Sequence, residues 1–313
     1  MEDKLSYERK MLEQLEMPSR RDVAHALLKT LVNHQGVIRE FSAGEEIVDE
    51  VANIFQLNEQ QRATYLKTIY RKENRIKKSL LWHRLLFRAA DYLAKESLIV
   101  RPTITVQLTK RKEWMLTEKG YDEGLRLLNI PISSKNVLPV KSYEVQKIVK
   151  KIVERPRPQN YNPFDNAKKS VKITRDMILR NRGFRQAVIE SYNYKCAVCG
   201  MKLNSPDAML WEVEAAHIVP HRAKGRDDVL NGIALCRLHH WAFDVGWFTL
   251  LDNFKIQTSK KIVSLPSDFG KSATYDFAKA LISNDSIIFL PNNSEIFPHL
   301  NSIRWHRENV FHN

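Results

Sequence analysis

Hydrophobic residues recur at helical spacing through the first hundred positions of the chain. Apolar positions three and four residues apart predict helices over 21–32, 45–55 and 76–96. Short runs rich in β-branched and aromatic residues then predict strands at 98–100, 104–108 and 114–116. Residues 109–113 would join the last two strands as a hairpin with a basic tip, before a short helix ending at Leu128. Three helices followed by a small hairpin is the order of a winged helix, whose third helix can enter the DNA major groove.

A proline-containing stretch separates this unit from the rest of the chain. Residues 145–153 predict a short basic helix, and Pro156, Pro158 and Pro163 then keep the backbone extended. We therefore expect an α+β protein in three parts: a winged-helix DNA-binding domain at 1–130, a basic linker at 131–170 and a second domain at 171–313.

The chain is strongly basic, which indicates a polyanionic partner. Its 313 residues include 50 Lys and Arg against 36 Asp and Glu, a formal net charge of +14. Residues 161–313 carry +5 of this charge and residues 1–160 carry +9, so both parts are basic. Nucleic acid is the partner that such an excess favours, and we expect double-stranded DNA.

No feature of the sequence indicates a membrane or a secreted protein. No apolar run reaches the roughly 18 residues that a membrane span needs. The first residues are too polar for the apolar core of a signal peptide. Three cysteines are too few for a disulfide scaffold. We therefore expect a soluble, cytoplasmic protein without a membrane partner.

Basic residues of the predicted helix 76–96 recur on the side opposite its apolar face. They are Lys77, Arg84, Arg88 and Lys95. The predicted hairpin tip adds Lys110, Arg111 and Lys112. Both sets are predicted DNA contacts, and the alternative for such a charge run is a solvated helix face.

Residues 19–128 also resemble the N-terminal domain of the Mrr-type restriction proteins. The similar segments are the helix end at 89–95, the pair Leu98-Ile99 and the exit at 114–120. The resemblance implies a winged helix that binds DNA. The alternative is a protein–protein module, because winged helices serve in that role as well.

All three cysteines of the chain lie in two short motifs that suit a metal ion. Cys196 and Cys199 form a CxxC, and Cys236 and His239 form a CxxH about forty residues later. Two such turns can supply four ligands to a tetrahedral, structural Zn²⁺. The alternatives are two unrelated cysteine turns or a redox CxxC, although a redox pair would not need Cys236 and His239.

A second set of polar residues lies between and just after these motifs. The segment 211–217, which ends at His217, alternates like a strand. Residues 236–245 predict the start of a helix with His240 and Asp244 one turn apart on one face. Neighbouring helical residues point about 100° apart, so His239 can bind zinc while His240 faces a second metal. We expect a further imidazole, His221, at the surface or against phosphate.

This arrangement resembles the HNH, or ββα-metal, nucleases, and most closely their McrA-like branch. The matching motifs are Ala215–Pro220, Asn231–Ile233, His239-His240 and Phe243-Asp244, within a similarity that runs from about Arg180 to the C-terminus. In that family the first His is the general base, the Asn orients it or reaches the metal, and the last His binds the catalytic metal. The resemblance assigns these roles to His217, Asn231 and His240.

Phosphodiester hydrolysis explains why these residue types occur together. It needs an activated water and charge neutralisation at the phosphate. Neutral His217 can take a proton from water near pH 7, and one Mg²⁺ or Mn²⁺ at His240 and Asp244 would stabilise the phosphate and the leaving group. The family's products carry a 5′-phosphate and a 3′-hydroxyl.

The chain departs from many HNH enzymes at one position of this motif. They carry a metal ligand immediately before the base, where this chain has Ala216. Glu214 lies two residues further back, on the face opposite His217 if the strand runs unbroken. The Glu214 side chain could become the metal ligand only if a bulge or turn brings it to the same face as His217. Otherwise Glu214 is a surface residue.

We therefore expect a metal-dependent DNA endonuclease of the restriction type, with the winged helix as its DNA reader. Cleavage of both strands with one active site per chain favours a homodimer. The alternatives are a DNA-binding regulator with a zinc-stabilised, non-catalytic scaffold, and an effector-triggered defence nuclease. His217, Asn231 and His240 together argue against the regulator, because a scaffold has no need of them.

Overall fold

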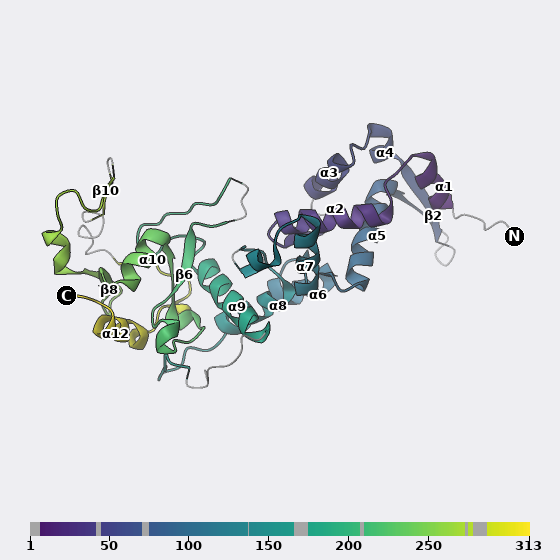
Figure 1. Ribbon diagram of the computed structural model, residues 1–313. Coiled ribbons are helices and arrows are strands. Elements are labelled where there is room, and N and C mark those ends of the chain that lie inside the picture. The colour runs from purple at the N-terminus through teal and green to yellow at the C-terminus, as the bar shows by residue number, and fades with distance from the viewer. Residues whose placement is uncertain are drawn as a thin grey trace. The chain divides into compact units, whose positions relative to one another are not determined.

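Two structural units follow one another along the chain. They span residues 1–144 and 145–313. Both contain helices and short antiparallel sheets, so the predicted α+β class is confirmed (Figure 1). The computed structural model describes residues 7–41, 45–70, 75–136, 138–165, 175–206, 210–272, 275–277 and 287–313. Within these residues no helix is long and apolar enough to cross a membrane.

The first unit is built around helix α2, Arg20–Asn33, which begins where the Ser19 side chain accepts a hydrogen bond from the Asp22 N–H. Helix α2 buries its leucines and packs against α5, Leu81–Lys95, and α7, Glu118–Leu127. The other α-helices described in this unit are α1 (Tyr7–Gln14), α3 (Glu45–Ile54), α4 (Glu59–Ala63) and α6 (Pro102–Thr109).

A three-stranded antiparallel sheet completes the core of the first unit. Its strands are β1 (Val37–Arg39), β4 (Ile99–Val100) and β5 (Glu113–Leu116), in the order β1-β5-β4. Trp114 and Met115 of the central strand are buried. A separate hairpin joins β2 (Tyr65–Tyr70) to β3 (Arg75–Leu80).

One predicted helix of this unit is too long. The helix predicted over 76–96 begins only at Leu81, because residues 75–80 form β3. Six consecutive pairs, from Tyr65–Leu80 to Tyr70–Arg75, join β3 to β2. The Tyr, Thr and Ile residues of β2 favour a strand, and pairing with it overrides the helical spacing of residues 76–80.

One predicted strand is a helix. Residues 104–108 are rich in β-branched side chains, yet they belong to α6, which Pro102 starts with its fixed backbone φ. Inside this helix the Thr105 hydroxyl donates a hydrogen bond of 2.5 Å to the carbonyl of Glu113. The helix ends at Lys110, whose φ of 61° is left-handed. Residues 110–112 therefore join a helix to β5 and are not the tip of a hairpin.

The second unit packs a helix on each side of a two-stranded sheet motif. Strands β6 (Val213–His217) and β7 (Gly232–Cys236) pair antiparallel, and α10 (Arg237–Asp244) follows β7 directly (Figure 1). Helix α9 (Arg175–Ser191) packs on both strands. The remaining elements include α8 (Tyr143–Val153), β8 (Phe248–Leu250), β9 (Ile256–Thr258), β10 (Lys271–Ser272), β11 (Tyr275–Asp276) and α12 (Leu300–Asn309). The short helix predicted at 145–153 is confirmed as α8.

Gly232 allows α9 to approach this sheet closely. A Cβ atom at Gly232 would lie 2.4 Å from Val188 Cγ2 and 3.0 Å from Phe184 Cε2. Phe184 in turn stacks on the ring of His217, with 4.0 Å between the ring centroids. The absence of a side chain at Gly232 therefore lets an aromatic ring of α9 support the predicted base.

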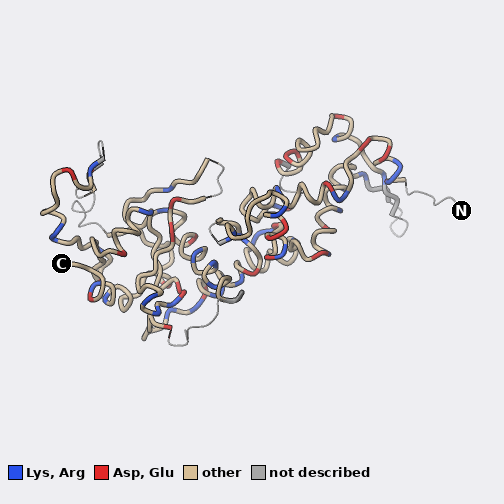
Figure 2. The backbone as a smooth tube through the Cα atoms, in the orientation of Figure 1, with Lys and Arg blue, Asp and Glu red and all other residues tan. Residues whose placement is uncertain are grey.

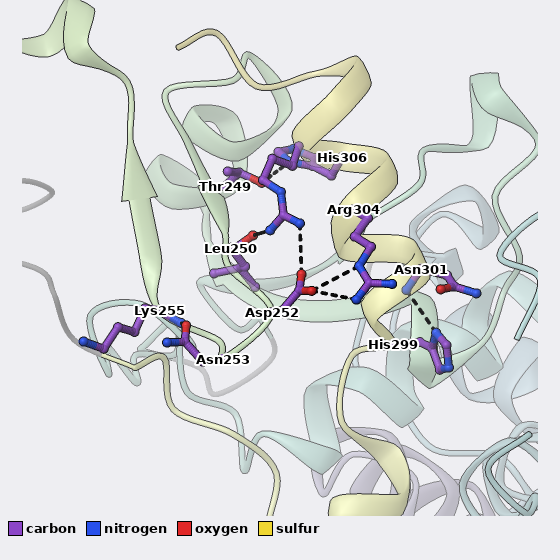
Figure 3. A network of polar contacts seen from close by, with 10 residues as sticks. Thr249, Leu250, Asp252, Asn253, Lys255, His299, Asn301, Arg304 and His306 are labelled. Carbon is purple, nitrogen blue, oxygen red and sulfur yellow. Dashed lines mark hydrogen bonds and ion pairs between the residues drawn. The ribbon is translucent and has the colours of Figure 1, made fainter. Parts of the chain in front are cut away.

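Polar contacts fasten α12 to β8 and the turn after it (Figure 3). Asp252 accepts hydrogen bonds from Arg304 at 2.7 and 3.1 Å and from Arg307 at 2.9 Å. His306 is buried, with its Nδ1 2.9 Å from the Thr249 hydroxyl and its Nε2 3.1 Å from a backbone carbonyl oxygen. Burial lowers the pKa of His306 to about 4.

This buried imidazole is expected to make the second unit acid-sensitive. Because the folded pKa lies below the unfolded value, the unfolded chain binds the extra proton, and stability falls as pH drops from about 6.5 to about 4. The loss has an upper bound of roughly 3 kcal/mol. Urea unfolding at several pH values would measure it. His306→Gln should flatten this dependence, whereas the matched variant His312→Gln, at the exposed chain end, should not. Equal pH dependence in wild type and His306→Gln would contradict the assignment.

Candidate functional site

The four zinc-ligand candidates converge at one point of the second unit. Cys196 and Cys199 lie in the turn after α9, Cys236 ends β7 and His239 lies in the first turn of α10. Their ligand atoms all lie within 4.8 Å of one another. Cys199 Sγ is 3.9 Å from Cys236 Sγ, which is 3.0 Å from His239 Nδ1.

The separation of these atoms suits a tetrahedral ion. Two sulfurs about 2.3 Å from a tetrahedral zinc would lie about 3.8 Å apart, close to the 3.9 Å between Cys199 and Cys236. Hydrogen bonds from Cys199 and Cys236 lower the pKa of the Cys196 thiol, which favours a thiolate at this position. Cys196, Cys199, Cys236 and His239 thus form a Cys₃His cluster that can hold zinc.

His217 ends β6 and contacts the loop that leads toward β7. Its side chain is 18% exposed. Its Nε2 lies 3.0 Å from Asp227 Oδ1, and the same oxygen lies 2.9 Å from His221 Nε2. The ligand atoms of these three residues also lie within 4.8 Å of one another. The predicted base therefore belongs to a group of two imidazoles and one carboxylate.

His240 lies on α10 between two carboxylates. Its Nδ1 is 2.9 Å from Glu214 Oε2, and its Nε2 is 3.5 Å from Asp244 Oδ2. Burial alone would lower the pKa of His240, but Glu214 and Asp244 raise it. The hydrogen bond from His240 lowers the pKa of Glu214 in return. The two acids engage opposite nitrogens of one ring.

Strand β6 runs without interruption through Glu214. Its five residues pair in register with β7, from Val213–Cys236 to His217–Gly232. The bulge that would turn Glu214 toward the face of His217 is absent from this strand. An ion bound to His240 Nε2 would be adjacent to Asp244, whereas Glu214 lies at the Nδ1 edge of the ring.

Asn231 braces the loop between His217 and Asp227. The residue is fully buried. Its Oδ1 accepts a hydrogen bond of 2.8 Å from the Val219 N–H, and its Nδ2 donates to the carbonyls of Val219 and Arg226 at 3.0 Å each. The amide therefore holds both sides of the loop at a fixed distance.

Sequence reasoning missed Asp227, whereas His221 is exposed, as expected for a surface residue. Asp227 stands in no motif that marks it as a partner of His217, and its neighbour Asp228 has the same charge. One signal in the sequence could have pointed to this group. His221 lies four residues after His217, and Asp227 lies four residues before Asn231.

The predicted DNA-contact residues are spread over three places in the first unit. Lys77 lies on β3, and its side chain is outside the described part of the structure. Arg84, Arg88 and Lys95 lie on α5, while Lys110, Arg111 and Lys112 are exposed between α6 and β5. Lys and Arg occur along both units, as expected from the charge of each part (Figure 2).

Glu8 of helix α1 pairs with two of these arginines. Its carboxylate oxygens lie 3.0 Å from Arg84 Nε and 2.8 Å from Arg88 NH1. The Glu8 side chain is only 10% exposed. Lys95 pairs with Asp91 at 3.1 Å. The predicted basic stripe is therefore not one continuous helix face, because it begins on a strand and acids neutralise its α5 part.

A comparison with protein families finds a match over the segment that carries the Cys₃His cluster, His217 and His240. Residues 196–251 match the HNH endonuclease family. This HNH segment begins at Cys196 and includes β6, β7, α10 and β8. Residues 196–251 are therefore similar to HNH endonucleases, in agreement with the resemblance of the sequence motifs.

One solved structure shows a partial similarity to the chain. It is described as a modification dependent TagI restriction endonuclease, with 20% sequence identity over 41% of this chain and a TM-score of 0.29. The match covers 37% of that chain. No curated protein matches.

Proposed function

We propose that this protein is a metal-dependent DNA endonuclease of the restriction type. The observation that carries the proposal is the arrangement on one β6–β7–α10 unit of His217 with Asp227 and of His240 with Asp244, inside the HNH segment. Burial raises the pKa of Asp244 overall, although the charges of both His240 and His217 act to lower it. One such site per chain cuts one strand at a time, and we also propose a homodimer on DNA.

His217 acts as the general base in this proposal. Its Nε2–H donates to Asp227 Oδ1 at 3.0 Å, which leaves the lone pair on Nδ1. That nitrogen takes a proton from the attacking water, and Asp227 stabilises the imidazolium that forms. Phe184 fixes the plane of the ring by stacking on it.

His240 and Asp244 are the proposed holders of the catalytic Mg²⁺ or Mn²⁺. Ligands at right angles around an ion with bonds of about 2.1 Å lie about 3 Å apart, and Nε2 and Oδ2 here are 3.5 Å apart. Bound there, the ion would neutralise charge on the phosphate and the leaving oxygen. Glu214 then orients His240 through Nδ1, the usual role of an acid behind a ligating imidazole.

We further propose that the first unit binds DNA as a winged helix. Support comes from the helices α2, α3 and α5 around a three-stranded antiparallel sheet, with exposed Lys110, Arg111 and Lys112 before the central strand. In this proposal α6 and the residues that follow it replace the hairpin that forms the wing of a winged helix. Phosphate contacts by these lysines and arginines would position the DNA.

Removal of the Glu8 charge is expected to strengthen DNA binding. Glu8→Gln frees Arg84 and Arg88 from their carboxylate, so that both can contact phosphate. Each added phosphate contact steepens the dependence of log affinity on log salt by about 0.9. Fluorescence anisotropy over a salt series measures both affinity and slope. The matched control is Glu13→Gln, on the same helix but paired with exposed Arg9. Unchanged binding by Glu8→Gln, or the same gain in both variants, would contradict the role of Glu8.

A cleavage assay tests the proposed function. The full-length protein is incubated with methylated and unmethylated plasmid DNA, with Mg²⁺ or Mn²⁺ supplied. We expect metal-dependent cleavage that leaves 5′-phosphate and 3′-hydroxyl ends. Tight DNA binding without cleavage under all four conditions would overturn the nuclease proposal and favour a DNA-binding regulator.

A further inference from the structure

Two imidazoles and a carboxylate in the HNH segment share one point in space. His217 Nε2 and His221 Nε2 lie 3.0 and 2.9 Å from the same oxygen of Asp227. These three atoms belong to different elements: the end of β6, the turn after Pro220 and the loop before β7. Such a set of two His and one acid is a known donor set for transition metals.

The surroundings of this group favour an ion over a chance contact of side chains. Asn231 holds the loop through Val219 and Arg226, so the three donors are positioned by buried backbone contacts. Gly225 lies within the same loop, where a Cβ atom would be 1.7 Å from the Val219 carbonyl oxygen. His221 and Asp227 therefore lie on a loop whose two sides are in direct contact, and His217 lies at the end of the strand that leads into it.

The group is partly accessible to solvent, chiefly at His221. The side chains of Asp227 and His217 are 14% and 18% exposed, while that of His221 is 39% exposed. Three protein ligands with an open fourth position suit Zn²⁺. Mg²⁺ prefers oxygen ligands and octahedral geometry, so it should not compete well for two imidazoles.

We infer that His217, His221 and Asp227 form a second binding site for a divalent transition ion such as Zn²⁺, separate from the Cys₃His cluster and from His240. A bound ion takes the lone pair of His217 Nε2 and leaves the proton of the neutral ring on Nδ1. His217 then has no lone pair with which to accept a proton from water. Zinc at this site should therefore switch off cleavage that Mg²⁺ supports, a consequence that rests on the proposed base role of His217.

Metal counting tests the site without any cleavage assay. The full-length protein is dialysed to equilibrium against buffered micromolar zinc, and zinc per chain is measured by mass spectrometry of the metal. We expect two zinc ions per wild-type chain, one per chain in His221→Ala and two in His240→Ala. A single zinc in the wild type overturns the inference. So does a second zinc that survives His221→Ala but is lost in His240→Ala.

Zinc titration into the Mg²⁺-supported reaction tests the consequence for activity. Zinc inhibition is expressed as a fraction of each variant's own Mg²⁺-supported rate, and on this scale His221→Ala should need at least about 10-fold more zinc for half inhibition, because loss of an outer-shell partner alone costs about 10–100-fold in metal affinity. The milder His221→Asn should behave in the same direction. Equal zinc sensitivity in wild type and both variants would overturn the switch. Absence of any Mg²⁺-supported cleavage would count against the proposed nuclease and leave the zinc count as an independent result.

Discussion

Replacement of Cys199 by serine is expected to unfold the HNH segment rather than merely slow a reaction. The variant removes one of four ligands in the Cys₃His cluster, whose atoms lie within 4.8 Å of one another. Structural zinc contributes on the order of 10 kcal/mol in small domains, comparable with the whole stability of about 5–15 kcal/mol of a typical domain. We expect loss of the bound zinc, a lower melting temperature by circular dichroism and faster proteolysis within residues 196–251.

A neighbouring substitution controls for this result. Met201→Ser introduces the same residue at a position of the same turn that is 45% exposed, and should leave the zinc content and the melting temperature nearly unchanged. A folded Cys199→Ser protein with no zinc and full stability would contradict a structural metal at the cluster.

Loss of the His217 imidazole is expected to abolish cleavage while DNA binding survives. His217→Ala removes the proposed proton acceptor but little positive charge, and general-base catalysis contributes about 10²–10⁴-fold to a rate. The rate of plasmid nicking at saturating Mg²⁺ and the affinity for the same DNA, measured together, separate the two effects. We expect a rate loss of this order with affinity changed less than about threefold, or less than about 0.7 kcal/mol.

His34→Ala is the matched control for the base, because His34 is a half-exposed imidazole of the first unit that pairs with Glu50. It should retain the cleavage rate. Undiminished nicking by His217→Ala would rule out the base assignment. A matched loss of affinity and rate would instead show that the substitution damaged the fold, which the melting temperature would report.

The sequence was most informative where chemistry restricts residue type and spacing. Cys196, Cys199, Cys236 and His239 could be grouped because few other roles require these ligands at these short intervals, and the structure brings the four together. His240 and Asp244 could be placed on one helix face from their spacing alone, and helix α10 has them there. Local patterns of this kind need no knowledge of the rest of the fold.

Predictions failed where the start of an element or its contact with another segment overrides the local residue pattern. Residues 104–108 have the composition of a strand, but their helix is fixed by Pro102 and by the contact of Thr105 with Glu113. Residues 76–80 have helical spacing, but pairing with β2 holds them extended. Glu8 could not be linked to Arg84, because 76 positions separate them in sequence and nothing local marks the pair.

The shared use of helix α10 has a practical consequence for chelation experiments. His239 faces the Cys₃His cluster, while the next residue, His240, pairs with Glu214 and Asp244. Under the proposed function, a strong chelator would inactivate the protein in two ways: by removing the proposed catalytic ion at His240, or by withdrawing zinc from the Cys₃His cluster and releasing the helix that carries His240. Rapid recovery on adding Mg²⁺ alone would identify the first route, and recovery that also requires zinc and time to refold would identify the second.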